Sequence, residues 1–139
     1  MAMSVSGYKV EDECKLRFLE LQRKKEFPYI TYKIDGRRKT VIVDKLGAEG
    51  EGYDAFIAAL PENECRYAVY DYDFVTPDNC EKSRIFFVFW SPDKTPVRSR
   101  MVYALSRDKF RKELDGVQVE LQATDVSELD LEILMAKAR

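Results

Sequence analysis

Hydrophobic residues recur along the chain with two periods, three to four residues in some segments and two in others. The first segment places Val10, Cys14, Phe18 and Leu21 at helical spacing. Acidic residues precede this stripe and basic residues follow it, an order that suits the helix dipole. We therefore expect a first helix that ends near Pro28.

Five segments are rich in β-branched and aromatic residues and predict strands. They are residues 29–34, 40–45, 65–74, 83–90 and 117–123. Asp35-Gly36 between the first two favours a tight hairpin turn. A turn-rich loop around Pro77 separates the third strand from the fourth.

Three further segments have helical spacing. The first is a short helix that begins at Tyr53 and ends at Pro61. The second is a long helix over residues 96–115, with Gly116 as its C-terminal cap. The last helix begins at Asp125, with Glu128 as its capping partner. Strands interleaved with helices, without strict repetition, indicate an α/β protein with a mixed sheet covered by helices on both faces. We expect one domain over residues 1–139, in which residues 1–8 form a flexible N-terminus.

Charge is segregated along this chain of net charge −2. Residues 82–112 hold nine basic and two acidic residues, net +7, whereas residues 47–81 are net −8. This pattern predicts a local docking surface for an acidic partner rather than a general polyanion binder. No apolar run approaches the roughly 20 residues that cross a bilayer, and the N-terminus has no hydrophobic signal core, so we expect a soluble protein of the cytoplasm or nucleus.

The residue types exclude most catalytic chemistry. The chain has no histidine, and Cys14, Cys65 and Cys80 form no Cys-x-x-Cys pair, so a zinc site, a disulfide framework and His-dependent catalysis are not expected. Asp71 and Asp73 point to one side of a predicted strand and are the remaining candidate acid/base pair, but a solvated strand face is the better interpretation. We predict a protein that is not an enzyme and holds no cofactor or metal.

The long helix carries the most informative pattern when it is plotted at about 100° per residue. One face is a core-facing stripe of Ser99, Val102, Tyr103, Ser106, Phe110 and Leu114. The opposite face carries Arg98, Arg100, Arg107, Arg111 and Lys112, with Met101 and Leu105 among them. A solvated charged face is the alternative, but apolar side chains ringed by arginines favour a docking site for a protein.

Other polyanions fit this helix face less well. A nucleic-acid site favours a broad basic surface with exposed aromatic side chains, whereas this chain is acidic overall and its aromatic residues fall within predicted strands. We therefore expect no specific nucleic-acid partner. Anionic phosphoinositide headgroups stay open as a secondary partner.

Several blocks of sequence, in order, resemble the actin-depolymerising factor/cofilin family, most closely its plant branch. They are residues 12–22 (DECKLRFLELQ), 65–76 (CRYAVYDYDFVT), 82–93 (KSRIFFVFWSPD), 97–110 (VRSRMVYALSRDKF) and 120–125 (ELQATD). The resemblance spans nearly the whole chain and implies a single actin-depolymerising-factor homology domain with a mixed sheet of five or six strands. It also implies a monomeric protein of the cytoplasm and cytoskeleton, with the nucleus as a further location.

The function implied by the resemblance is actin binding. Members bind actin monomers, preferring the ADP-bound form, and filaments, which they sever and depolymerise. The alternative is a variant that mainly stabilises or bundles filaments. The resemblance maps the monomer and filament surface to Ser6, Gly7, Arg98, Arg100 and Met101, and additional filament contacts to Lys82, Arg84 and Lys137.

Ser6 also matches a serine whose phosphorylation inactivates many members of this family; an added dianion would repel acidic actin. The chain departs from the family pattern at Leu105, where a small hydroxyl residue is common, and at Met135 and Ala136, which replace polar residues. We hypothesise that Leu105 belongs to the actin-binding surface and strengthens its apolar docking. All three departures bear on filament severing more than on actin binding.

Overall fold

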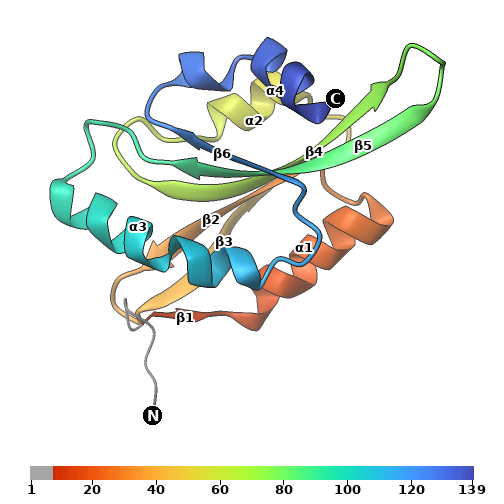
Figure 1. Ribbon diagram of the computed structural model, residues 1–139. Helices are drawn as coiled ribbons and strands as arrows, with labels where there is room; N and C mark the ends of the chain where they lie inside the picture. Colours follow the sequence, from red (N-terminus) through yellow and green to blue (C-terminus); the bar gives the residue numbers. More distant parts are fainter. Residues whose placement is uncertain (1–7) are drawn as a thin grey trace.

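The computed structural model describes residues 8–139, which form a mixed sheet of six strands (Figure 1). The strands are β1 (Lys9–Val10), β2 (Tyr29–Asp35), β3 (Thr40–Leu46), β4 (Arg66–Val75), β5 (Glu81–Trp90) and β6 (Val119–Ala123), in the order β1-β3-β2-β4-β5-β6. The outer pairs, β1 with β3 and β5 with β6, are parallel, and the inner pairs are antiparallel. The predicted mixed α/β sheet is confirmed.

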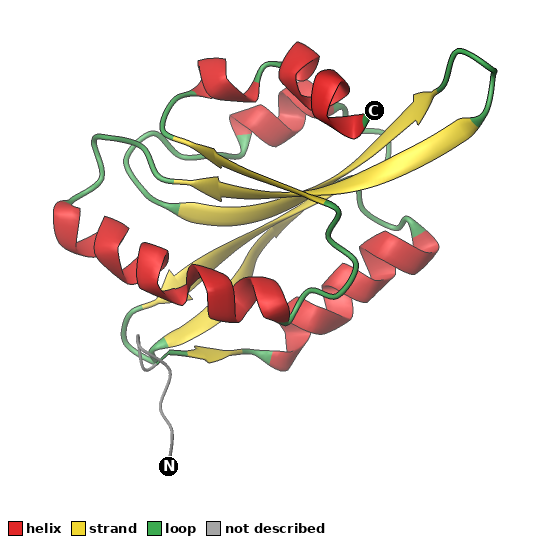
Figure 2. Ribbon diagram, in the orientation of Figure 1, coloured by secondary structure: helices red, strands yellow, loops and turns green. Residues whose placement is uncertain are grey.

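Helices cover both faces of the sheet (Figure 2). The helices are α1 (Asp12–Lys24), α2 (Tyr53–Ala58), α3 (Val97–Lys112), the 3-10 helix η1 (Val126–Leu129) and α4 (Leu131–Ala138). Side chains of α1 and α3 pack on one face of the sheet and form a first core with strand residues such as Tyr67. Side chains of α2, η1 and α4 pack on the other face and form a second core with the alternate strand residues, such as Ala68. Both faces are buried, which explains the nearly continuous apolar runs of β4 and β5. No helix within residues 8–139 has the length and apolar character to cross a membrane.

The first helix is shorter than the sequence predicts. Val10 belongs to β1, where it pairs with Val41 of β3, so assigning it to the helix was wrong. The helix starts at Asp12 and ends at Lys24, before Pro28, because Lys25 adopts a left-handed backbone conformation with φ of 53°. Its predicted stripe of Cys14, Phe18 and Leu21 is fully buried.

The predicted hairpin of β2 and β3 forms, but its turn differs. The connection is residues 36–39 rather than a two-residue Asp-Gly turn. The Asp35 carboxylate accepts hydrogen bonds from the backbone N–H groups of Arg37 and Arg38, and Lys39 takes the positive φ of 50°. In this Asx-type turn the aspartate side chain accepts hydrogen bonds from backbone N–H groups, and the adjacent glycine does not take a positive φ.

The long helix and the last helix also differ from the prediction in their bounds. α3 ends at Lys112, and Gly116, with φ of 114°, lies in the turn beyond it. The single last helix is in fact two, because Asp130 is extended and separates η1 from α4. Asp125 caps η1 by accepting from Ser127 N–H, whereas Glu128 accepts from Thr124 N–H, one residue outside the expected capping pair.

Strands β4 and β5 extend past the rest of the sheet as a two-stranded projection (Figure 1). β2 pairs with β4 as far as Tyr70, and β6 pairs with β5 from Phe86 onwards. Residues 71–75 and 81–85 therefore pair only with each other within the sheet. We call these two segments the arm.

Candidate functional site

Helix α3 presents the exposed apolar pair predicted from its helical pattern. Tyr103, Ser106, Phe110 and Leu114 of the predicted core-facing stripe are buried, which confirms most of it, whereas Ser99 and Val102 at its N-terminal end are only half-buried. Met101 is 58% exposed and Leu105, one turn later, is 51% exposed. Large apolar side chains that stay in water at such adjacent positions are typical of a docking surface.

Arg98 and Arg100 flank this pair at the N-terminal end of α3. Arg98 is exposed and Arg100 is half-buried. Arg100 Nη1 lies 3.9 Å from a carboxylate oxygen of Asp93, an exposed residue, so the ion pair is weak and the Arg100 guanidinium keeps its capacity to bind a partner. The basic charge predicted around Met101 is therefore present at this end of the helix.

The prediction for the other end of the basic face was wrong. Arg107 and Arg111 do not stand free, because each donates a hydrogen bond to the Glu120 carboxylate on β6, at 3.0 and 3.1 Å. A helical projection gives the direction of a side chain but not the identity of the strand beside it. The free basic surface of α3 is consequently smaller than the sequence suggests, and its C-terminal half is attached to the sheet.

The N-terminal part of the predicted surface lies partly outside the described residues. Ser6 and Gly7 precede Tyr8, the first described residue. The Lys109 ammonium on α3 donates a hydrogen bond to the Tyr8 backbone carbonyl. A groove of about 410 Å³ beside α3 is lined by residues that include Tyr8, Arg98 and Tyr103. The start of the described chain and the predicted face of α3 are thus neighbours.

A second surface is formed by the arm and the end of α4. Lys82 and Arg84 of β5 line a concavity of about 470 Å³ with Phe74, Ala138 and Arg139. The Arg84 guanidinium lies 5.6 Å from the centre of the Phe74 ring, a cation-π arrangement. Lys137 is exposed on the last turn of α4, next to Ala138. The structure therefore brings the end of α4 to the two arm residues that were predicted with Lys137.

The two surfaces are separate. Helix α3 lies on one face of the sheet and α4 on the other (Figure 1). Arg139, which was not among the predicted site residues, lines the second surface together with Lys82. Its position as a basic residue three places after the α4 residue Ala136 was an available signal. One molecule can therefore contact two bodies at once.

The candidate carboxylate pair is not a solvated strand face. The Lys25 ammonium bridges Asp71 and Asp73 at 2.8 and 3.0 Å, and the Asp71 side chain is only 6% exposed. Burial raises the pKa of Asp71, and the hydrogen bond from Lys25 opposes that rise. The sequence pattern correctly places both aspartates on one side, but the strand face there is covered by the end of α1.

The buried thiols are poor nucleophiles. Burial raises the pKa of Cys14 to about 12 and raises that of Cys65 as well, so neither forms a thiolate readily near neutral pH. Residues 8–139 contain no cluster of three histidine, cysteine, aspartate or glutamate side chains suited to a metal ion.

Comparison with known proteins gives a consistent result. The model of a family described as cofilin/tropomyosin-type actin-binding protein matches residues 7–139. Actin-depolymerizing factor 6 of Oryza sativa subsp. japonica is 59% identical over 138 residues, which cover 99% of each chain. Actin-depolymerizing factor 10 of Arabidopsis thaliana is 58% identical over 137 residues, 99% of this chain and 98% of that one.

Solved structures agree with these sequence relatives. A crystal structure of Streptomyces griseoflavus cofilin matches with a TM-score of 0.85 at 35% identity, over 93% of this chain and 95% of that one. Actin depolymerization factor 2 of Plasmodium berghei matches with a TM-score of 0.85 at 29% identity, over 99% of both chains. The six-stranded sheet with helices on both faces is the fold of these proteins.

Proposed function

The chain belongs to the actin-depolymerising factor/cofilin family, in its plant branch, and we propose how its two surfaces act on actin. It binds actin monomers and filaments and promotes the depolymerisation and turnover of filaments. We propose in addition that it prefers ADP-actin, that it severs filaments, and that the two surfaces described above are the ones that bind actin.

The observation that carries the proposal is the exposed pair Met101 and Leu105 beside Arg98 and Arg100 on α3. An adaptable methionine supplies contact area that loses water on docking, and arginines are enriched where protein interfaces gain their energy. Actin is acidic, so the arginines match its charge. This face of α3, with Ser6 and Gly7 as its N-terminal part, binds both monomers and filaments.

The arm and the end of α4 supply the contact that only a filament satisfies. Lys82 and Arg84 line a surface on the other layer from α3, and Lys137 is exposed one residue before Ala138, which lines the same surface. A second actin subunit meets this surface while the first is held by α3. Binding to two subunits at once favours the filament geometry that fits both surfaces. ADP-actin filaments adopt this altered geometry more readily. Filaments then break at the boundaries between altered and unaltered segments.

Regulation acts on the α3 surface. Phosphorylation of Ser6 adds a dianion where acidic actin would bind, so it weakens docking. Phosphoinositide headgroups compete for the same basic side chains as secondary partners. The protein works as a monomer and recognises no specific nucleic-acid sequence.

The activity needs no catalytic site. The family consists of actin-binding proteins and is not known for enzymes. In this chain the one candidate carboxylate pair is occupied by Lys25, and burial holds the pKa of Cys14 and Cys65 above the ordinary range. We therefore propose a binding protein without cofactor or metal, acting at the actin cytoskeleton in the cytoplasm and also in the nucleus.

Filament bundling is the second candidate. Its support is the exposed apolar side chain of Met135 on α4, next to exposed Ala136, at two positions where the family resemblance implies polar residues. An apolar second surface could join filaments instead of breaking them. Sedimentation separates the two functions, since depolymerisation moves actin to the supernatant of a high-speed spin, whereas bundling creates a pellet at low speed. A low-speed pellet that disappears in Met135→Gln would overturn the severing function in favour of bundling.

A further inference from the structure

The arm has little support from its own strands. It consists of the five register pairs from Asp71 with Ile85 to Val75 with Glu81. The first pair is bonded to chain outside the arm, through Asp71 N–H to the Pro28 carbonyl and Gln118 N–H to the Ile85 carbonyl. The four outer pairs have no third strand beside them. A two-stranded ribbon alone is at best marginally stable in water, and it twists more than a strand within a wide sheet. Side-chain contacts must therefore decide the direction of the outer arm. Tyr72 and Phe74 pack against the second core on one face, and the other face needs a contact of its own.

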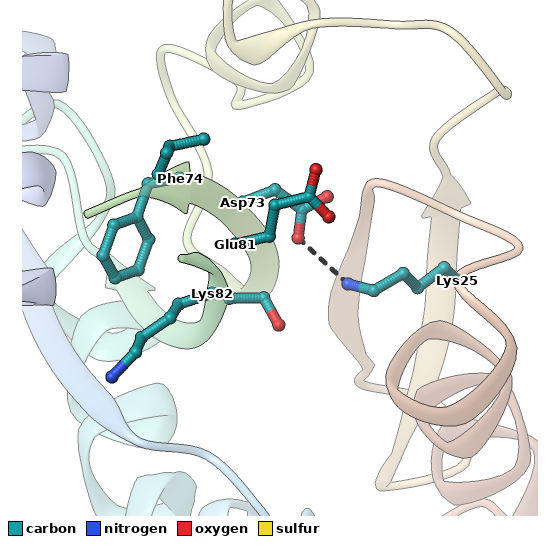
Figure 3. Close-up of a pocket in the computed structure, with 7 residues that line it drawn as sticks. Lys25, Asp73, Phe74, Glu81 and Lys82 are labelled. Atoms are coloured by element: carbon teal, nitrogen blue, oxygen red, sulfur yellow. Dashed lines mark hydrogen bonds and ion pairs between the residues drawn. The ribbon is translucent and has the colours of Figure 1, made fainter. Parts of the chain in front are cut away.

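Lys25 supplies such a contact from the end of α1. Its left-handed backbone ends the helix, and its N–H donates to the Glu20 carbonyl, which anchors the residue. Its ammonium then lies 2.8 Å from Asp71 Oδ2 at the base of the arm and 3.0 Å from Asp73 Oδ1 two residues further out. Figure 3 shows Lys25 pointing across a cavity of about 560 Å³ towards Asp73.

The two ion pairs differ in strength. Asp71 is buried, so an unpaired charge there would be costly, and Lys25 compensates it. Asp73 is 67% exposed, so its pair with Lys25 contributes little energy alone but fixes a second point along the strand. Two points define a direction, and the bridge therefore constrains the angle of the arm as well as its base.

Lys25 acts on the arm from the face opposite the proposed filament contacts. Cross-strand partners share a face, so Lys82 lies with Phe74 and Arg84 lies with Tyr72. Asp71 and Asp73 alternate with these residues and point the other way. Figure 3 agrees, since Lys82 points away from Lys25. A partner bound at Lys82 and Arg84 therefore does not need to touch Lys25.

We propose that Lys25 is a positioning residue for filament binding, which sets the direction of the arm and thereby the placement of Lys82 and Arg84 against the second actin subunit. The inference rests on the proposed function of the two surfaces. It makes binding to filaments dependent on a lysine that lies outside both of them. Monomer binding through α3 does not depend on this bridge.

The experiment compares Lys25→Gln with the wild type and with Lys24→Gln, which removes the same charge from the exposed preceding residue. Cosedimentation measures affinity for filaments, and the fluorescence of labelled ADP-actin measures affinity for monomers. In Lys25→Gln the arm is loosened, and ordering it on binding costs free energy. The filament affinity should therefore fall by roughly three- to tenfold, while the monomer affinity stays unchanged. Lys24→Gln should match the wild type in both assays.

Two further measurements separate positioning from a general structural role. Hydrogen exchange should be faster at the arm amides of Lys25→Gln and unchanged in β2 and β6. Lys25→Arg keeps a cation whose donors can reach both Asp71 and Asp73, so it should retain most of the filament affinity. Equal loss of monomer and filament affinity, unchanged arm exchange, or filament affinity equal to the wild type would each overturn the inference. Failure of the wild type to bind actin would instead overturn the proposed function.

Discussion

The Lys109 ammonium donates a hydrogen bond to the backbone carbonyl of Tyr8 at 2.6 Å, across 101 residues of sequence. This contact attaches the beginning of the described chain to α3. Ser6 is joined to Tyr8 through a single intervening residue, so a change at Ser6 occurs within a short reach of α3. The bond gives a structural reason why modification of the N-terminus should affect the α3 surface.

A negative charge at position 6 should weaken actin binding. We expect Ser6→Asp to lower the affinity for monomers by about tenfold, because like charges across an interface repel, while Ser6→Ala stays close to the wild type. Titration of labelled actin monomers measures the effect. Ser127→Asp places the same charge on the exposed η1 helix as a control. Equal losses in both aspartate variants would refute a local effect at the N-terminus.

Leu105 should add to the apolar part of the docking surface. We expect Leu105→Ser to weaken actin binding by about 1 kcal/mol, since its exposed side chain would lose water only when actin docks. Isothermal titration with monomeric actin measures the change. Leu16→Ser, at an exposed leucine on α1, is the matched control and should have no effect. Unchanged affinity in Leu105→Ser would remove this residue from the surface.

A buried ion pair should dominate the polar contribution to stability. Arg66 on β4 is buried, and its Nε donates to Asp44 on β3, which also accepts from the hydroxyl of buried Thr31. Asp44→Ala removes the carboxylate bonded to Arg66 Nε and leaves Glu64, 3.1 Å from Arg66 Nη1, as the remaining ion-pair partner. It should lower the free energy of unfolding by about 2 kcal/mol, as urea denaturation would show. Glu13→Ala breaks an exposed pair with Arg17 and should cost less than about 1 kcal/mol. Similar losses for both variants would contradict the assignment.

Actin binding should depend weakly on pH between 6 and 8. The chain has no histidine. Hydrogen bonds lower the pKa of Asp35 and Glu128, so the stability that these groups add is present above their ordinary range and is lost only as the pH falls through the lowered values. Burial raises the pKa of Asp71, so any stability from its protonated form is present at low pH and is lost as the pH rises through the raised value.

Affinities measured at pH 6, 7 and 8 check this expectation. Any change of affinity with pH that comes from actin itself should be the same for the wild type and Asp71→Asn. A pH dependence of the affinity that disappears in Asp71→Asn would contradict the expectation and identify Asp71 as a titrating group that affects binding.

Local patterns predict much of the fold and part of the site. Helical spacing correctly predicts that Phe110 is buried and that Met101 is exposed, because side-chain direction along a helix depends only on the local backbone. Val10 was misassigned because its structure depends on pairing with β3, which lies about 30 residues later in the sequence. Periodicity contains no information about such a partner.

The same limit applies to ion pairs. Glu120 binds Arg107, and Lys25 binds Asp71, because of how α3 and α1 lie against the sheet. The sequence shows these charges but not their distances. It therefore overestimates the free basic face of α3 and does not reveal the contact that supports the arm.

We propose that the N-terminal half of α3 binds actin. The most direct test is Arg98→Ala/Arg100→Ala, observed by imaging single filaments and by titration of actin monomers, with Arg23→Ala on α1 as an exposed control. Removing two interface arginines should weaken monomer binding by about tenfold or more, which corresponds to about 1.4 kcal/mol or more, and should abolish filament shortening. The Arg23→Ala control should behave as the wild type. A folded double variant that binds monomers and shortens filaments as the wild type does would contradict the account.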